Sequence, residues 1–216
     1  MSDKRKSEIK FAQFEYQVFF PDPVFEPQRL FGCVSKVYDG LKPFKIAPLA
    51  VKYPGGASTP LDTLVSFQLA NSRYTLSLSL ARFSFKADYV DWSQEPIITS
   101  IIEATAKALT DGLKNEISSH QLQIAMHVVV PGVSMKEFTR SFLPLVKRPA
   151  DDAEFNGFVL YTRTGDFMVD KSAAHEEGMF VRITRKFEGK IAFSEMAKVL
   201  YTEEMWLAET LGIEIE

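Results

Sequence analysis

An alternating run that stops at a proline constrains the fold of this chain more than any other feature. In residues 11–20, FAQFEYQVFF, one set of alternate positions is apolar throughout, namely Ala12, Phe14, Tyr16, Val18 and Phe20. The positions between them include Gln13, Glu15 and Gln17. A period of two predicts a half-buried strand of the antiparallel type, with one face toward water. Pro21 and Pro23 end the strand, because proline cannot donate to a sheet ladder.

A helix is predicted directly after this strand. Apolar residues recur at helical spacing and form one stripe, at Leu30, Phe31, Val34, Tyr38 and Leu41. Pro27 fits the first turn, where its missing N–H would have no partner in any case, and Gly40 and Pro43 mark the end. Phe11–Leu41 is therefore predicted to be a strand followed by a helix.

A shorter version of this pattern returns later in the chain. The run QLQIAMHVVV stops at Pro131, and Ser134 with Glu137 forms a capping box for a second helix that Pro144 ends or kinks. Both parts then continue through a loop and antiparallel strands to a helix. The order predicts an α+β fold with two similar strand-helix-strand-strand-helix halves, in which helices pack on one face of antiparallel sheets. The predicted halves are residues 1–116 and residues 117–216. They form either two separate units or one continuous domain.

The remaining elements are predicted from the same two periods. Leu64–Ala70 and Arg73–Phe85 form a hairpin around Asn71 and Ser72, and a helix capped by Asp91 or Ser93 runs to Leu113. Strands follow at Phe155–Thr162, Asp166–Asp170 and Met179–Phe187, and a last helix, Ser194–Leu211, has Gly212 as its C-cap. The first ten residues are predicted to be a frayed lead-in.

The Pro/Gly-rich stretch 44–62 is predicted to be a surface loop. It holds three prolines and a Gly-Gly pair but lacks the G-x-x-x-x-G-K-[ST] pattern of a phosphate-binding loop. Because long loops often carry function, this segment is the first candidate for a functional loop.

Three features together resemble a known family. They are the strand that ends at Pro21, the aromatic strand that contains Arg82 and Phe83, and Tyr89 and Trp92 ahead of a helix. In this order they are similar to an uncharacterised, sporadically distributed bacterial family that is built as a doubled α+β unit. The resemblance implies the fold and no activity.

Composition excludes several classes of partner and location. The formal net charge of −3 and a charged fraction of 25% give no bulk attraction to nucleic acid or anionic membranes. No run of about 18 apolar residues is present to span a membrane, and the N-terminus lacks the apolar core of a secretory signal. The single cysteine, Cys33, has no partner for an internal disulfide and falls in the apolar pattern of the first helix. These features predict a soluble, cytoplasmic protein.

No pattern of catalytic, cofactor-binding or metal-binding residues is evident. The three histidines, His120, His127 and His175, have no His or Cys at ligand spacing, and a solvated loop explains His175-Glu176-Glu177. No catalytic residue, metal or cofactor is therefore predicted, and the balance is against an enzyme.

The sequence leaves two functional hypotheses. The first is a non-catalytic interaction or structural subunit that acts as a homo-oligomer or in a small bacterial complex. The alternative is a small-ligand-binding protein or an enzyme with a pocket between the halves, under the 44–62 loop. Candidate surface or pocket residues are Tyr53, Arg82, Tyr89, Trp92, His127 and Arg182.

Overall fold

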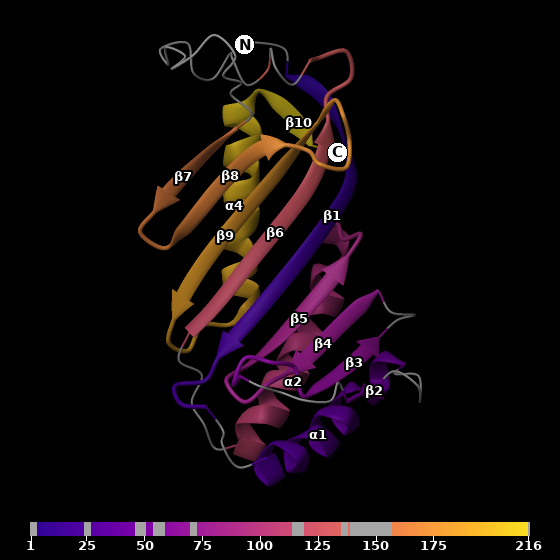
Figure 1. Cartoon of the computed structure of the whole chain (residues 1–216), viewed down its shortest axis with the longest axis vertical. Coiled ribbons are helices and arrows are strands. Elements are labelled where there is room, and N and C mark those ends of the chain that lie inside the picture. The colour runs from indigo at the N-terminus through magenta and orange to yellow at the C-terminus, as the bar shows by residue number, and fades with distance from the viewer. Residues whose placement is uncertain are drawn as a thin grey trace. The chain divides into compact units, whose positions relative to one another are not determined.

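The computed structural model of the chain describes residues 4–23, 27–45, 51–53, 59–69, 73–113, 119–134, 138 and 157–215. Within these residues the chain is a mixed α+β protein, with a large antiparallel sheet and three α-helices (Figure 1). The predicted α+β class is confirmed at this level.

The described elements follow one another along the chain in two parts. The first part of the chain forms β1 (Arg5–Phe19), α1 (Pro27–Leu41), a 3₁₀ turn η1 (Lys42–Phe44), β2 (Val51–Lys52), β3 (Val65–Leu69), β4 (Tyr74–Leu78), β5 (Arg82–Asp88), a 3₁₀ turn η3 (Trp92–Gln94) and α2 (Glu95–Leu113). The second part forms β6 (Ser119–Val129), β7 (Phe158–Thr162), β8 (Gly165–Lys171), β9 (Gly178–Glu188), α4 (Phe193–Leu211) and β10 (Ile213–Ile215).

The sheet runs in the order β2-β3-β4-β5-β1-β6-β9-β8-β7, and β10 pairs with β1 off this path. The β1–β5, β3–β4, β4–β5, β7–β8 and β8–β9 pairs are antiparallel, whereas β10 runs parallel to β1. Within the described parts of the chain, none of the helices combines the length and apolar character that crossing a membrane requires.

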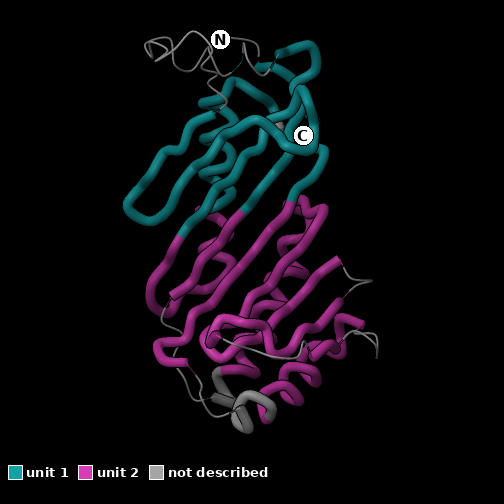
Figure 2. Tube along the Cα trace, in the orientation of Figure 1, with its two compact units in different colours: residues 1–12, 124–185, 200–216 teal, residues 13–123, 186–199 magenta. Residues whose placement is uncertain are grey.

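The chain divides into two compact units (Figure 2). Unit 1 contains Met1–Ala12, Ile124–Arg185 and Leu200–Glu216, and unit 2 contains Gln13–Gln123 and Lys186–Val199. Each unit thus takes residues from both parts of the sequence. The division predicted between residues 116 and 117 stays a prediction.

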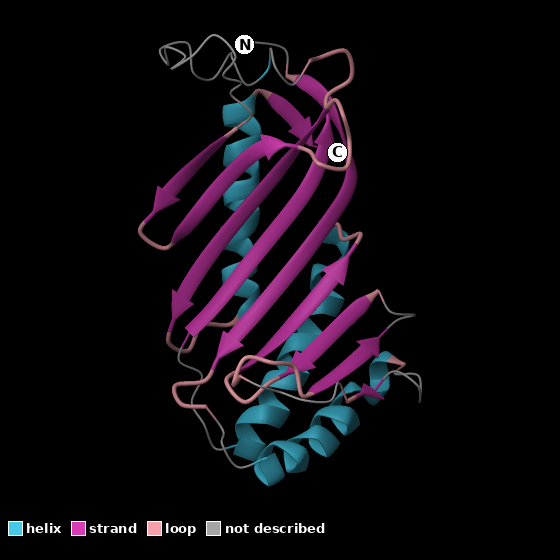
Figure 3. Cartoon of the chain, in the orientation of Figure 1, coloured by secondary structure: helices cyan, strands magenta, loops and turns pink. Residues whose placement is uncertain are grey.

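Unit 2 is built on a core of aromatic and aliphatic strand residues covered by α1 and α2. The largest fully buried side chains come from β3, β4 and β5 and include Phe67, Leu76, Phe83 and Phe85. In α2, Ile98, Ile101 and Ile102 are buried as the predicted stripe requires. Figure 3 shows α2 on one side of these strands.

Unit 1 places its core between α4 and the strands β8 and β9. Phe167 and Val169 of β8 pair with Ile183 and Val181 of β9, and all four side chains are buried. The ring of Phe167 lies 5.1 Å from that of Trp206 on α4. The helix therefore covers this face of the strands. Gly212, at φ 65°, ends α4 as the sequence predicts, because glycine adopts this left-handed conformation without strain.

Two predictions about strand bounds are wrong. The N-terminal strand begins at Arg5 rather than Phe11, because Arg5–Ser7 pairs with the last strand, β10, and the Ser7 hydroxyl donates to the Glu214 carbonyl at 2.6 Å. The predicted strand Arg73–Phe85 is interrupted after Leu78, where the Ser79 hydroxyl oxygen accepts hydrogen bonds from the amides of Ala81 and Arg82. A serine turn of this kind leaves the alternating pattern intact, so the pattern does not reveal it.

Some predicted features lie outside the described residues. These include the Asn71-Ser72 turn, Glu137 of the capping box, most of the helix expected after Ser134, and the greater part of the 44–62 loop. At the expected start of that helix, the amide of Phe138 donates to the carbonyl of Ser134 at 2.9 Å, as in a helical turn.

Candidate functional site

The six candidate residues fall into both units. In unit 2, Tyr53 follows β2 and Tyr89 follows β5, and both side chains are exposed. Trp92 begins η3, and Arg82 of β5 donates from Nη1 to the side-chain oxygen of Gln17 at 2.8 Å. Tyr89 has a φ of 55°, and its carbonyl accepts from Arg73 at 2.6 Å. These contacts account for the positions of Arg82 and Tyr89 structurally.

The other two candidates, His127 and Arg182, share one face of unit 1. Arg182 alternates with the buried Val181 and Ile183, so it lies on the face of β9 opposite α4. His127 of β6 packs against Phe180, which is on the same face of β9, with ring centroids 5.2 Å apart. Arg182 pairs with Asp166 of β8 at 3.0 Å, and both side chains are partly exposed. This face carries the rings of His127 and Phe180 and the Arg182–Asp166 ion pair.

A contact between His127 and Ser172 resembles a catalytic histidine–serine pair, but its hydrogen bonds hold the turn between β8 and β9. His127 Nδ1 lies 2.7 Å from the Ser172 hydroxyl, whose oxygen accepts from the amides of Ala174 and His175 at 3.1 and 3.0 Å. Because both lone pairs of the hydroxyl are engaged, its proton goes to Nδ1 and the oxygen is closed to attack on a substrate. The contact fixes the turn between β8 and β9.

His175 lies beside His127, with ring centroids 5.9 Å apart. Two histidines are fewer than a stable zinc or copper site needs. In the described residues no group of three His, Cys, Asp or Glu side chains is placed to hold a metal ion.

We expect the pKa of His127 to lie below its ordinary value of 6.5. Burial disfavours the charged ring, and the neighbouring His175 opposes a second positive charge. The unfolded chain then binds a proton at a higher pH than the folded chain does, so the free energy of unfolding falls as the pH is lowered through 6.5 toward the folded pKa. A titration of the histidine ring signals by NMR checks this, and a His127 pKa above 6.5 contradicts it.

A second histidine, His120, is held in a buried chain of hydrogen bonds in unit 2. The Tyr16 hydroxyl lies 2.6 Å from His120 Nδ1, and His120 Nε2 lies 3.0 Å from the Gly189 carbonyl. Since the carbonyl only accepts, Nε2 carries the proton and the Tyr16 hydroxyl donates to Nδ1. Burial lowers the pKa of His120 and raises that of Tyr16 well above the ordinary range. These two hydrogen bonds join β1 and β6 to the turn after β9.

The sequence does carry a signal for this buried histidine. His120 stands two residues before Leu122 and so belongs to the buried set of β6. A polar residue on the buried side of a strand predicts a hydrogen-bond partner, because burying it without one is costly.

Replacing Tyr16 by phenylalanine tests whether the hydrogen bonds of His120 stabilise the fold. The variant keeps the ring but leaves His120 Nδ1 buried without a donor, which is expected to lower the free energy of unfolding by about 1–2 kcal/mol. Urea denaturation of Tyr16→Phe and of Tyr53→Phe, whose hydroxyl is on an exposed side chain, measures the difference. Equal stabilities for the two variants would show that the buried hydroxyl has no such role.

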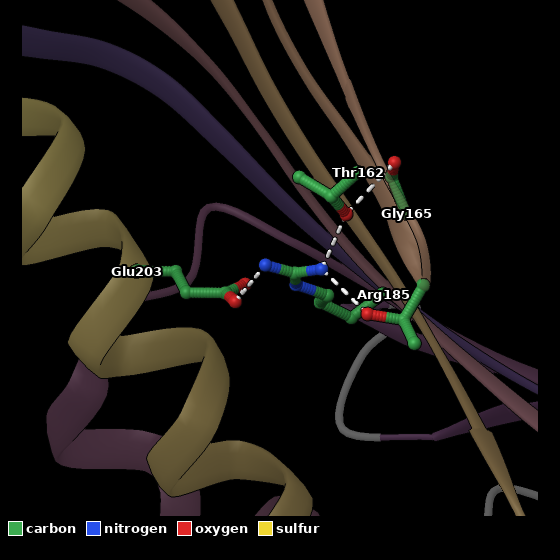
Figure 4. A network of polar contacts seen from close by, with 5 residues as sticks. Thr162, Gly165, Arg185 and Glu203 are labelled. Atoms are coloured by element: carbon green, nitrogen blue, oxygen red, sulfur yellow. Dashed lines mark hydrogen bonds and ion pairs between the residues drawn. The ribbon is translucent and has the colours of Figure 1, made fainter.

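A network around Arg185 holds the β7–β8 hairpin against α4 (Figure 4). One guanidinium nitrogen, Nη1, donates to the hydroxyls of Thr162 and Thr164 at 2.6 and 2.7 Å, and the other, Nη2, pairs with Glu203 of α4. The guanidinium also lies over the ring of Phe167, 5.2 Å from its centroid. Arg185 is in line with Val181 and Ile183, on the face that α4 covers. Arg185 is not among the candidate residues predicted from the sequence, although the alternation of β9 places it in line with buried residues.

The hairpin held in this way ends the sheet at β7. Among the described strands β7 pairs with β8 alone, and Figure 1 shows it as the outermost strand on its side of unit 1. Three consecutive side chains are exposed: Val159 by 39%, Leu160 by 45% and Tyr161 by 80%. Trp206, 44% exposed, extends this apolar surface onto α4. We call Val159, Leu160, Tyr161 and Trp206 the β7 surface.

The β7 surface is not predicted from the sequence. The apolar residues predict the strand, but strand periodicity does not say which strand ends a sheet. The signal that was available is the absence of charge in Phe158–Thr162, because edge strands usually carry a charge or a proline.

Comparisons with known proteins assign no family. No protein-family model matches the chain, and a search of curated proteins gives no match.

Proposed function

We propose that this chain is a non-catalytic interaction or structural subunit of the bacterial cytoplasm that works by self-association through the β7 surface. The observation that carries the proposal is the uncharged edge strand β7, with Val159, Leu160 and Tyr161 exposed in succession. Adjacent strand residues point to opposite faces, so apolar groups are exposed on both sides of this edge. Exposed apolar side chains on both faces of an uncharged strand, at an edge that no other described strand pairs with, are typical of a site for another chain.

The histidine geometry of unit 1 supports a role without catalysis. Ser172, whose hydroxyl is paired with His127, has both lone pairs bound to backbone amides. Arg182, on the same face, is paired with Asp166. These groups have structural roles that explain their positions, and the β7 surface has none within the described part of the chain.

We also propose that the two halves of the sequence repeat one plan, as in the bacterial family that the sequence resembles. The support is the order of elements. Strands β3, β4 and β5 are followed by the 19-residue helix α2, and β7, β8 and β9 are followed by the 19-residue helix α4. The order β3-β4-β5-β1-β6-β9-β8-β7 also reads alike from both ends when β1 is matched to β6 and β5 to β9. A doubled subunit with an edge strand suits assembly into a symmetric oligomer.

Multi-angle light scattering of the purified full chain tests self-association. The mass at elution is measured over a hundredfold range of loading concentration, and we expect a mass of twice 24.4 kDa at the highest loads. A mass that stays at 24.4 kDa throughout would reject self-association, and a pull-down that also recovers no partner would reject an interaction role altogether.

A further inference from the structure

We infer that the partner of the β7 surface is a second copy of this chain, bound with its own β7 antiparallel to the first and with Leu160 on the two-fold axis. The inference rests on the proposed function and specifies its partner and its geometry. It follows from the backbone register of β7, from its side-chain order and from its charge.

The backbone register determines which groups of β7 face outward. Arg163 and Thr164 form a two-residue turn, and Thr162 lies opposite Gly165 in the ladder. A hairpin with a loop of this length closes on a pair that exchanges both hydrogen bonds, and such pairs alternate along an antiparallel ladder. Thr162 and Leu160 therefore direct their backbone groups at β8, and the N–H and C=O groups of Val159 and Tyr161 face outward.

Only antiparallel registers that join outward-facing residues can form a ladder with a second β7. With Leu160 on the axis, Val159 lies opposite Tyr161 of the partner subunit, and Tyr161 lies opposite Val159 of the partner subunit. Each of these pairs exchanges two hydrogen bonds, so the register uses all four outward-facing groups of each strand. It is centred within Phe158–Thr162 and needs no residue beyond the strand.

The side chains are self-complementary in the same register. Tyr161 opposite Val159 is an aromatic–β-branched pair, one of the favoured cross-strand pairs, and the two-fold axis makes it twice. Arg163, at the end of the hairpin, falls opposite Gly157 of the partner subunit, which has no side chain to obstruct it. No like charges oppose each other, because Phe158–Thr162 is uncharged.

The strand at the other end of the sheet order, β2, has a feature that disfavours pairing with another chain. There the edge strand β2, Val51–Lys52, carries a lysine. A lysine on an edge strand is a common device that prevents edge-to-edge association. The uncharged β7 has none.

The helix side of β7 adds area to the contact. Leu160 pairs with Phe167 across the β7–β8 ladder, and the ring of Phe167 contacts Trp206. Leu160 and Trp206 thus belong to the same face, and both are about half exposed. In the two-fold arrangement this face meets its own copy, so Leu160 is buried at the centre of the contact.

Disulfide trapping of cysteine variants of the full chain tests the register. In a non-hydrogen-bonded antiparallel pair the Cα atoms lie about 4.5 Å apart, within the range that a disulfide spans. We expect Leu160→Cys to form a covalent dimer under mild oxidation, and to do so at least tenfold faster than Val159→Cys or Tyr161→Cys alone. Leu61→Cys, an exposed position in unit 2, is the matched control, and the native Cys33 is buried. Circular dichroism verifies that each variant is folded.

A second measurement covers the case in which Leu160→Cys does not fold. An equimolar mixture of Val159→Cys and Tyr161→Cys, joined by a short bis-maleimide, is expected to give more cross-linked dimer than either variant alone.

The outcomes separate this inference from the proposed function. A dimeric wild type whose Leu160→Cys variant cross-links no faster than Leu61→Cys overturns the β7 pairing and leaves self-association standing. Fastest cross-linking at Val159 or Tyr161 overturns the register centred on Leu160. A wild type that stays monomeric at every concentration overturns both.

Discussion

Replacing Glu203 by alanine is expected to lower the free energy of unfolding by about 3 kcal/mol. Glu203 is the counter-charge of Arg185, and the two side chains are only 16% and 14% exposed. Its removal leaves a guanidinium largely buried without an opposite charge, which is the most costly way to break such a pair. Alanine is also the best helix former, so a loss of stability cannot come from the propensity of α4. Urea denaturation monitored by circular dichroism measures the change.

An exposed ion pair provides the matched control. Asp39 and Lys42 in the α1–η1 region pair at 2.7 Å, but both side chains are about 60% exposed. Asp39→Ala is expected to leave stability unchanged within error, because water and salt screen such a pair. Equal effects of the Glu203 and Asp39 variants would contradict the view that the buried pair holds α4 to the hairpin.

The double variant Arg185→Met/Glu203→Leu separates charge burial from packing. Apolar side chains of similar length remove both charges together and retain contact with Phe167. Most of the stability lost in Glu203→Ala is therefore expected to return. A double variant that is no more stable than Glu203→Ala would indicate that the hydrogen bonds of Arg185 to Thr162 and Thr164, rather than its charge, are what the fold requires.

Gly165→Ala is expected to have a similarly large effect, a loss of about 3 kcal/mol. A Cβ atom at Gly165 would collide with the backbone carbonyl of Thr184, whose carbon lies 2.9 Å from the Cβ position. Backbone atoms cannot move aside as a flexible side chain can, so β8 would have to separate from β9 at the start of the hairpin. Chemical denaturation and the near-ultraviolet signal of Trp206 report the change.

Gly32→Ala is the control, and its expected effect on the free energy of unfolding has the opposite sign. Gly32 lies inside α1, and a Cβ added there meets no atom within 4 Å. The same substitution should therefore stabilise the protein, by up to about 1 kcal/mol, through helix propensity. If Gly165→Ala is also neutral or stabilising, the close approach of β8 and β9 at Gly165 is not a feature of the molecule in solution.

The elements that depend on local periodicity were predictable from the sequence. The alternation of Ala12, Phe14 and Tyr16 against Gln13 and Glu15 identified β1 and its buried face. The apolar stripe of α2 and the glycine that ends α4 were likewise predictable from the local sequence. In each case the pattern within one segment states which face is buried, because one face must pack on the rest of the protein.

The features that depend on pairing across the chain were not predictable. The strand character of Arg5–Ser7 depends on β10, and the position of β7 at the end of the sheet depends on the strand order. Arg185 and His120 occupy buried positions in their strand patterns, but their partners Glu203 and Tyr16 lie far away in sequence. The exposure of the β7 surface depends on strand pairing in the same way. The apolar residues of a strand predict that it is buried, and only the strand order shows that it lies at an edge.

Sedimentation velocity of two lysine variants tests most directly whether the chain works through its β7 edge. Leu160→Lys places a charge against its own copy at the centre of the proposed contact, whereas Leu61→Lys places the same charge at an exposed position in unit 2. We predict that the wild type and Leu61→Lys sediment as dimers at high concentration, and that Leu160→Lys remains a folded monomer. A Leu160→Lys variant that assembles as well as the wild type would contradict the account.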